Sequence, residues 1–157
     1  MPGTVERQGE IDVPIDFAFG FVADYHNVPK WMFGVSEFQP RTDRTHGIGA
    51  VFATSFSSGI AALEVELTAV EWRDDEVITL ESQQEPAIRA RFTFASANTG
   101  STLVRVRIDY PVRPGLAGRV LEKISETIVG QAVRHVETNL RRELISAYRT
   151  EHPGAFG

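Results

Sequence analysis

The fold of this chain is decided by residues 16–31, which read DFAFGFVADYHNVPKW. Asp16 is a candidate N-cap for a first helix, because a short acidic side chain accepts hydrogen bonds from free backbone N–H groups. Tyr25-His26-Asn27 breaks that helix, and a second short helix is predicted over about 28–33. Pro29 would lie in its first turn, where a missing N–H costs little. The segment therefore predicts two short, aromatic-rich helices in succession.

Strands are predicted on both sides of this helical segment, because apolar and polar residues alternate there. They cover about 4–13 before the helices and 35–42, 49–58, 61–72, 76–84, 87–97 and 102–112 after them. The alternation is clearest where Phe92 and Phe94 oppose Arg91, and where Val106 opposes Arg105. One wet face and one buried face are typical of an antiparallel sheet.

Arg7 is the exception within the first strand. Simple alternation places it on the nominally buried side with Ile11 and Val13. A buried arginine would need a partner, or would hold a polar group of a ligand. We favour a bulge at Gly9 that turns the side chain outward.

A long C-terminal helix is predicted over about 114–149, with apolar residues every four positions from Leu116 to Leu144. Each such step drifts by about 40° on a helix of 3.6 residues per turn. The apolar faces before and after Gly130 therefore do not coincide, so either the helix bends there or its halves contact different elements. We favour a second half that packs on the sheet and a first half that roofs a cavity.

Length and composition narrow the class of protein. A chain of 157 residues is expected to form one domain, with an ordered core over about 4–149. The net charge of −5 argues against nucleic-acid binding, because neutralising phosphates needs a basic surface. There are no cysteines, and we see neither a signal peptide nor a stretch long enough for a spanning helix. We expect a cytoplasmic protein without integral membrane association.

Several short motifs carry a resemblance to a known family. They are Ile11-Asp12-Val13-Pro14, Pro29-Lys30-Trp31, Gly47-Ile48-Gly49, Val70-Glu71-Trp72 and Thr99-Gly100-Ser101-Thr102-Leu103, followed by the long terminal helix. With these, the chain resembles the START-like (SRPBCC) helix-grip superfamily, in its polyketide cyclase/dehydratase and lipid-transport branch. The resemblance implies an α+β, Bet v 1-like fold: a strand, two helices, six strands and a helix. The seven-stranded curved antiparallel sheet would wrap around the C-terminal helix and leave a cavity between them.

The resemblance also implies a range of functions. Members bind hydrophobic ligands; some cyclise, aromatise or dehydrate polyketides, and others have no catalytic role. The expected function is binding of a hydrophobic or aromatic small molecule, lipid-like or polyketide-like. One alternative is a cofactor-independent polyketide cyclase/aromatase, and another is a protein-interaction module with a closed cavity. Both a monomer and a homodimer remain open.

Candidate site residues follow from this layout. The expected ligand-binding side chains are Trp31, Phe33, Phe52, Phe56, Phe92, Phe94, Val120, Ile124, Ile128 and Gln131, with Trp31 as a gate near the entrance. If the protein is an enzyme, His135 and Tyr110 are the candidates for moving protons, since histidine titrates near neutrality. No metal or other cofactor is expected, because the histidines lack the spacing of a helical metal site.

Overall fold

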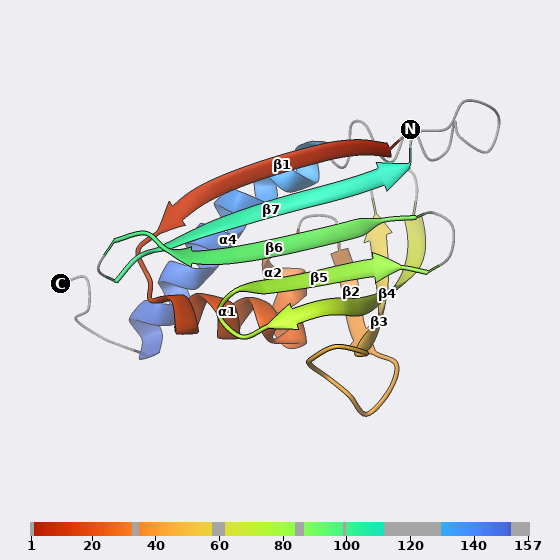
Figure 1. The fold of residues 1–157 in the computed structure, drawn as a ribbon, viewed down its shortest axis with the longest axis horizontal. Coiled ribbons are helices and arrows are strands. Elements are labelled where there is room, and N and C mark those ends of the chain that lie inside the picture. The colour runs from red at the N-terminus through yellow and green to blue at the C-terminus, as the bar shows by residue number, and fades with distance from the viewer. Residues whose placement is uncertain are drawn as a thin grey trace.

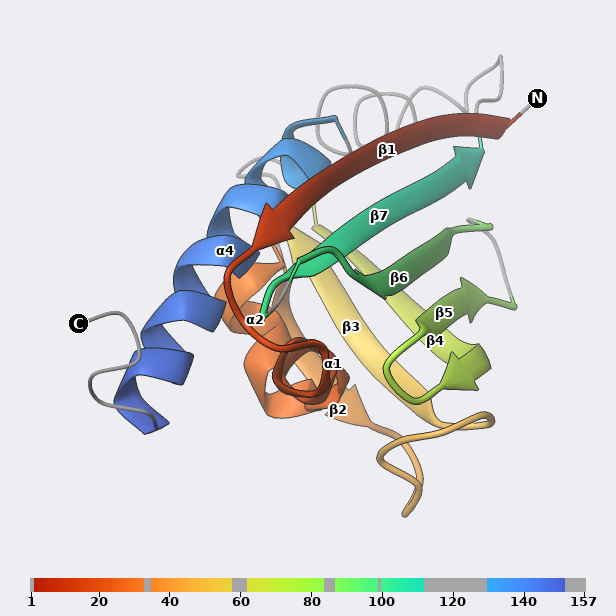
Figure 2. The same cartoon turned by 60° about the vertical axis from the view of Figure 1, so that its left-hand side comes forward.

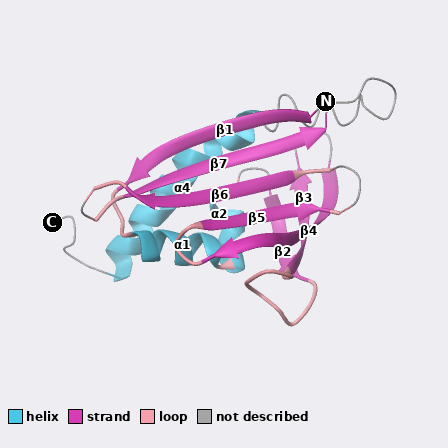
Figure 3. Cartoon of the chain, viewed as in Figure 1, coloured by secondary structure: helices cyan, strands magenta, loops and turns pink. Residues whose placement is uncertain are grey.

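The computed structural model describes residues 2–32, 35–57, 62–83, 87–98, 100–111 and 130–151. Strand β1 (Pro2–Ile11) leads into helix α1 (Ile15–Ala23), the 3-10 turn η1 (Tyr25–Asn27) and helix α2 (Val28–Trp31). The strands that follow are β2 (Val35–Pro40), β3 (Val51–Ser57), β4 (Ala62–Arg73), β5 (Val77–Ser82), β6 (Arg89–Ser96) and β7 (Thr102–Pro111). Helix α4 (Gly130–Glu151) closes the described chain (Figure 3).

The described strands form one antiparallel sheet in the order β1-β7-β6-β5-β4-β3-β2 (Figure 1). The sheet curves around the helices, and α4 packs against β1 and β7 as well as against α1 and α2 (Figure 2). The predicted helix-grip layout is therefore confirmed. The second half of the predicted long helix corresponds to α4, whereas its first half, with any bend before Gly130, lies outside the described residues.

The inner face of the sheet carries the core. On β6, Ala90, Phe92 and Phe94 are buried while Arg89 is exposed, as the alternation predicts. The register pairs Phe92 with Val106 of β7, and directly opposite residues share one face of a sheet. Burial of this apolar surface is the main stabilising contribution, at about 25 cal/mol per Å².

Two register shifts adjust which side chains face inward. One lies between Val35 and Glu37 on β2, and the other between Ala69 and Glu71 on β4. An extra residue in a strand reverses the facing of the residues after it. Past the second shift, Trp72 pairs with Ile78 on the inner face, and Glu71 pairs with Thr79 on the outer face.

The outer face is a network of arginines and acceptors. The Glu71 carboxylate accepts a hydrogen bond from the Thr79 hydroxyl at 2.8 Å and from Arg91 Nε at 3.3 Å. The hydrogen bond from Thr79, and the nearby positive charges, lower the pKa of Glu71. Arg107 Nε lies 3.4 Å from Asp109 Oδ1 in the same way. The two ion pairs are partly exposed, and such pairs contribute little each, so the outer face supports solubility more than stability.

Two local expectations are wrong. Helix α1 begins at Ile15 after Pro14, whose carbonyl accepts the first helical hydrogen bond, from Ala18 N at 2.9 Å. Asp16 is therefore a first-turn residue instead of the N-cap, and its Oδ1 accepts from the N–H of Phe17. The cause is the extended backbone of Pro14, which sets the boundary two residues earlier than Asp16 would.

The bulge expected at Gly9 is also absent from the described strand, because the β1–β7 register runs without a shift from Pro2 to Ile11. Arg7 stands opposite the buried Val106, so simple alternation placed it on the correct face. Its side chain is nevertheless exposed, at the edge strand of the sheet.

Candidate ligand-binding site

The turn between α1 and α2 sets the position of the site. Asp24 caps η1, because its Oδ1 accepts from the backbone N–H of His26 at 3.0 Å and lies 2.8 Å from His26 Nδ1. Asn27 Nδ2 donates to the carbonyl oxygen of Phe21 at 3.2 Å, which satisfies a carbonyl near the end of α1. These contacts turn the chain so that α2 presents Trp31 to the inner face of the sheet.

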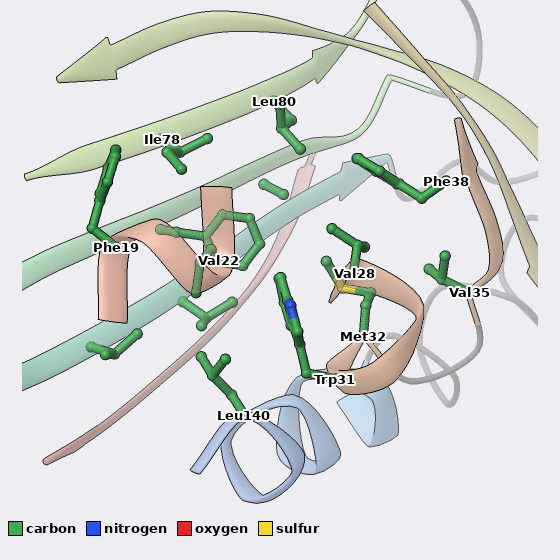
Figure 4. Close-up of a cluster of buried hydrophobic side chains, with 14 of the residues drawn as sticks. Phe19, Val22, Val28, Trp31, Met32, Val35, Phe38, Ile78, Leu80 and Leu140 are labelled. Carbon is green, nitrogen blue, oxygen red and sulfur yellow. The ribbon is translucent and has the colours of Figure 1, made fainter. Parts of the chain in front are cut away.

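Trp31 is at the centre of the interior. Its side chain is 1% exposed, and its ring meets Phe92 edge-on at a centroid distance of 5.5 Å. Figure 4 shows it rising from α2 between Val22 and Met32, with Leu140 of α4 beside it. The indole Nε1 has no hydrogen-bond partner among the described residues. Buried polar groups are nearly always paired, so an unpaired donor here calls for an explanation.

A cavity lies beside Trp31, between the short helices and the sheet (Figure 4). The described side chains around it are apolar or aromatic: Val22, Ala23, Tyr25, Val28, Trp31, Met32, Phe38, Phe52, Trp72, Ile78, Leu80 and Phe92. About 360 Å³ among them is free of atoms, part of it open to solvent, and about 20 Å³ can take the centre of a water molecule. That is room for about one water, since a water needs roughly 10–15 Å³ by this measure.

Half-buried aromatic rings form the mouth of the cavity. Tyr25 stacks on His26 at 4.0 Å, and Trp72 lies 6.5 Å from His46. Both Tyr25 and Trp72 are partly exposed, whereas Trp31 is not. The expected gating position of Trp31 therefore does not fit, because its ring lies in the interior, whereas the partly exposed aromatic rings of the described lining, Tyr25 and Trp72, belong to η1 and β4.

The structure brings part of the predicted site together. Trp31, Phe52 and Phe92 line the cavity. Phe94 packs on Phe19 at 5.3 Å and is not among the described lining residues. The remaining candidates fall where side chains are not described (Phe56, Tyr110, Gln131 and His135) or outside the described residues (Phe33, Val120, Ile124 and Ile128).

Several lining residues were not among the predicted ones, and their signals differ. Val22 and Val28 stand on the apolar sides of the predicted helices, so helical periodicity could have indicated them. Phe38 and Trp72 follow the two register shifts, which reverse their facing. Alternation of apolar and polar residues does not indicate a register shift, so the inward facing of Trp72 could not be predicted from the sequence.

The charge pattern of the site is simple. Among the described lining residues none carries a formal charge, and the polar atoms come from Tyr25, Trp31 and Trp72. In the part of the chain that the structure describes, no three acidic or histidine side chains gather as metal ligands would. Nor does any described helix have the length and apolar content to cross a membrane. The arrangement suits an uncharged molecule held mainly by apolar contact.

Comparison with known proteins agrees with the fold. Residues 2–144 match the family described as polyketide cyclase / dehydrase and lipid transport, and the chain belongs to that family. No curated protein matches the chain.

Solved structures of low identity share the architecture. The Zhui aromatase/cyclase from Streptomyces sp. R1128 is 12% identical, with a TM-score of 0.80 over 98% of this chain and 99% of that one. A START superfamily protein from Mycobacterium smegmatis is 15% identical, with a TM-score of 0.72 over 92% and 98%. Norcoclaurine synthase from Thalictrum flavum is 9% identical, with a TM-score of 0.69 over 92% and 94%. The chain thus has the START/Bet v 1-like helix-grip fold.

Proposed function

We propose that this protein binds a hydrophobic or aromatic small molecule, lipid-like or polyketide-like, in the cavity between the short helices and the sheet. The observation that carries the proposal is the wall of the cavity, whose described side chains are all apolar or aromatic around the buried Trp31. Membership of a polyketide cyclase and lipid-transport family supports the same class of ligand.

Binding would be driven by burial of apolar ligand surface, at about 25 cal/mol per Å² before the costs of association. The space admits about one water, which is less than any such ligand needs, so binding requires side chains of the wall to move apart. Met32 is the most adaptable of them, because its unbranched side chain has three rotatable bonds.

The test is uptake of the neutral fluorescent probe N-phenyl-1-naphthylamine by the whole chain and by two matched variants. Ala23→Leu adds bulk at the cavity wall, whereas Ala53→Leu makes the same change on β3, where Phe52 faces the cavity and Ala53 the other side of the sheet. We expect the wild-type protein to bind the probe, and Ala23→Leu to weaken binding about tenfold, through overpacking. Ala53→Leu should bind as the wild type does, and equal binding by all three proteins would refute the cavity as the site.

A catalytic role is the second candidate, favoured by the family and by the likeness to an aromatase/cyclase. Among the described lining residues, Tyr25 alone has a titratable side chain. Because the described lining contains no histidine or carboxylate, His135 and Tyr110 remain the proposed acid/base groups, acting without a cofactor. His135→Ala should abolish any cyclisation of a polyketide chain while leaving probe binding intact, and unaltered turnover would refute the role of His135.

The small free volume favours a third candidate, a protein-interaction module with a closed interior. The exposed Ile48, 61% accessible in the loop after β2, would then be part of an outer contact. Failure of the wild-type chain to take up the neutral probe would support this reading over both of the others.

A further inference from the structure

Within the cavity, the Trp31 N–H is a hydrogen-bond donor that has no acceptor in the part of the chain that the structure describes. The side chain is 1% exposed, it lines the cavity, and its Nε1 contacts no acceptor. An indole nitrogen can only donate, so the missing partner must be an acceptor. The surrounding wall of Val22, Val28 and Phe92 supplies none.

A bound water is a poor occupant for this position. The space holds about one water, but a buried water normally makes about three hydrogen bonds. Trp31 offers a single donor, and its neighbours Val22, Val28 and Phe92 are hydrocarbon. An oxygen that is part of an apolar molecule meets both conditions, because its skeleton contacts the wall while one lone pair accepts the N–H.

The same wall restricts the charge of the ligand. No described lining residue carries a formal charge opposite to that of a carboxylate, phosphate or ammonium group. Transferring an unpaired charge into such surroundings is strongly unfavourable. A ligand with a charged head would need that head outside the mouth formed by Tyr25 and Trp72.

We infer that the buried part of the ligand is uncharged and largely apolar, and carries one acceptor oxygen of the ketone or ether type that takes the Trp31 N–H. This inference rests on the proposed function and narrows its ligand class. Thr54 Oγ1 is the other buried side-chain atom without a partner among the described residues. It stands opposite Phe38, whose ring lines the cavity, so a second polar group lies close to the same wall.

The test uses two rigid probes of one shape, 9-fluorenone with a carbonyl and fluorene with a methylene at the same position, titrated into the full chain by calorimetry. We expect fluorenone to bind about 2- to 10-fold more tightly, the value of one net hydrogen bond. Trp31→Phe should lose this preference and bind the two probes with equal affinity. Trp72→Phe, which removes the indole N–H at the mouth, should keep the preference.

The outcomes separate the inference from the proposed function. If the wild-type chain binds both probes equally, or if Trp31→Phe keeps the preference, the acceptor is wrong while the apolar site stands. If neither probe binds, both fail. Should Trp31→Phe not fold, the infrared carbonyl band of fluorenone on the wild-type protein decides. A band below its position in an apolar solvent supports a hydrogen bond, and an unshifted band overturns the inference.

Discussion

Two regions of the interior differ in whether their buried polar side-chain atoms are hydrogen-bonded. Where the start of β7 meets the turn before α1, the fully buried Thr102 donates its hydroxyl to the carbonyl oxygen of Val13 at 2.8 Å. In the cavity region, Trp31 lines the cavity and the buried Thr54 stands opposite Phe38 of its wall, and neither polar side-chain atom has a partner among the described residues. The buried hydroxyl of the first region is hydrogen-bonded within the fold, whereas the two buried polar atoms of the second region are not, as far as the structure describes the chain.

The difference separates a structural region from a region suited to binding. Near Thr102, α1 and α4 also meet through the rings of Phe17 and Tyr148, 5.0 Å apart and edge-on, and Leu144 is completely buried. Polar groups that are satisfied within the fold stabilise it, whereas unsatisfied ones cost free energy until something binds them. Substitutions in the two regions should therefore act on different quantities.

The largest effect is expected from Leu144→Ala. The side chain is 0% exposed on α4, so truncation removes apolar contacts and leaves a cavity in the structural region. We expect the free energy of unfolding to fall by about 2–5 kcal/mol, measured by urea denaturation. A loss below about 1 kcal/mol, as at an exposed site, would mean that α4 does not pack as described.

Thr102→Val tests the satisfied hydroxyl. It leaves the Val13 carbonyl without its donor in a fully buried position. The expected cost is about 1–3 kcal/mol of unfolding free energy, because the orphaned carbonyl is not solvated. Thr102→Ser, which keeps the hydroxyl, is the matched control and should lose less.

Thr54→Val makes the same chemical change in the cavity region. It therefore tests directly whether removing a buried hydroxyl has different effects on stability in the two regions. Its hydroxyl has no partner within the described ranges, so replacing it by a methyl group of similar shape removes an unsatisfied group. We expect a gain or a change within about 0.5 kcal/mol, from the same denaturation experiment. If both threonines cost the same, the contrast between the two regions would be lost.

The smallest effect on stability is expected from a substitution of Glu10, which lies at the surface beside the structural region. Its carboxylate accepts from the Ser101 hydroxyl at 2.7 Å and from Asn98 Nδ2 at 2.8 Å, and these two hydrogen bonds lower the pKa of Glu10 from its ordinary value of 4.5. A lowered pKa in the folded state stabilises the fold above the unfolded pKa, and this stabilisation is lost as the pH falls through the folded pKa.

Glu10→Gln should therefore lower the urea midpoint at about pH 7 and change it less at about pH 3, where the wild-type carboxyl is protonated too. Glu6→Gln is a control on the same strand, since the Glu6 carboxylate lies 3.8 Å from Arg105 and outside this pair of hydrogen bonds. A Glu10→Gln difference that is independent of pH would contradict the assignment.

The sequence predicted the elements of this molecule better than its site. Alternation on β6 and β7 is strong because one face meets water and the other the core, so the facing of Phe92 and Val106 could be read directly. The start of α1 depends on Pro14, which is its N-cap, whereas the sequence pattern indicated Asp16 as the N-cap. Arg7 lies on the inward-facing side of β1 and is nevertheless exposed, because β1 is at the edge of the sheet.

The site was harder because it depends on three-dimensional details. A one-residue shift before Trp72 turns that ring inward, and no local pattern announces it. Burial of Trp31 at 1% depends on packing from α2, β6 and α4 together, which sequence spacing does not supply. The apolar class of the lining was predictable, but the division between wall and mouth was not.

The most direct test is nuclear magnetic resonance of the two indole N–H groups, since the chain has only two tryptophans, Trp31 and Trp72. Trp72→Phe assigns the signals, and 9-fluorenone is then titrated into the 15N-labelled wild-type protein. We expect the Trp31 Nε1–H signal to move downfield when the donor gains an acceptor, and we expect fluorene not to reproduce this shift. A Trp31 signal that stays in place while fluorenone binds would contradict the central claim.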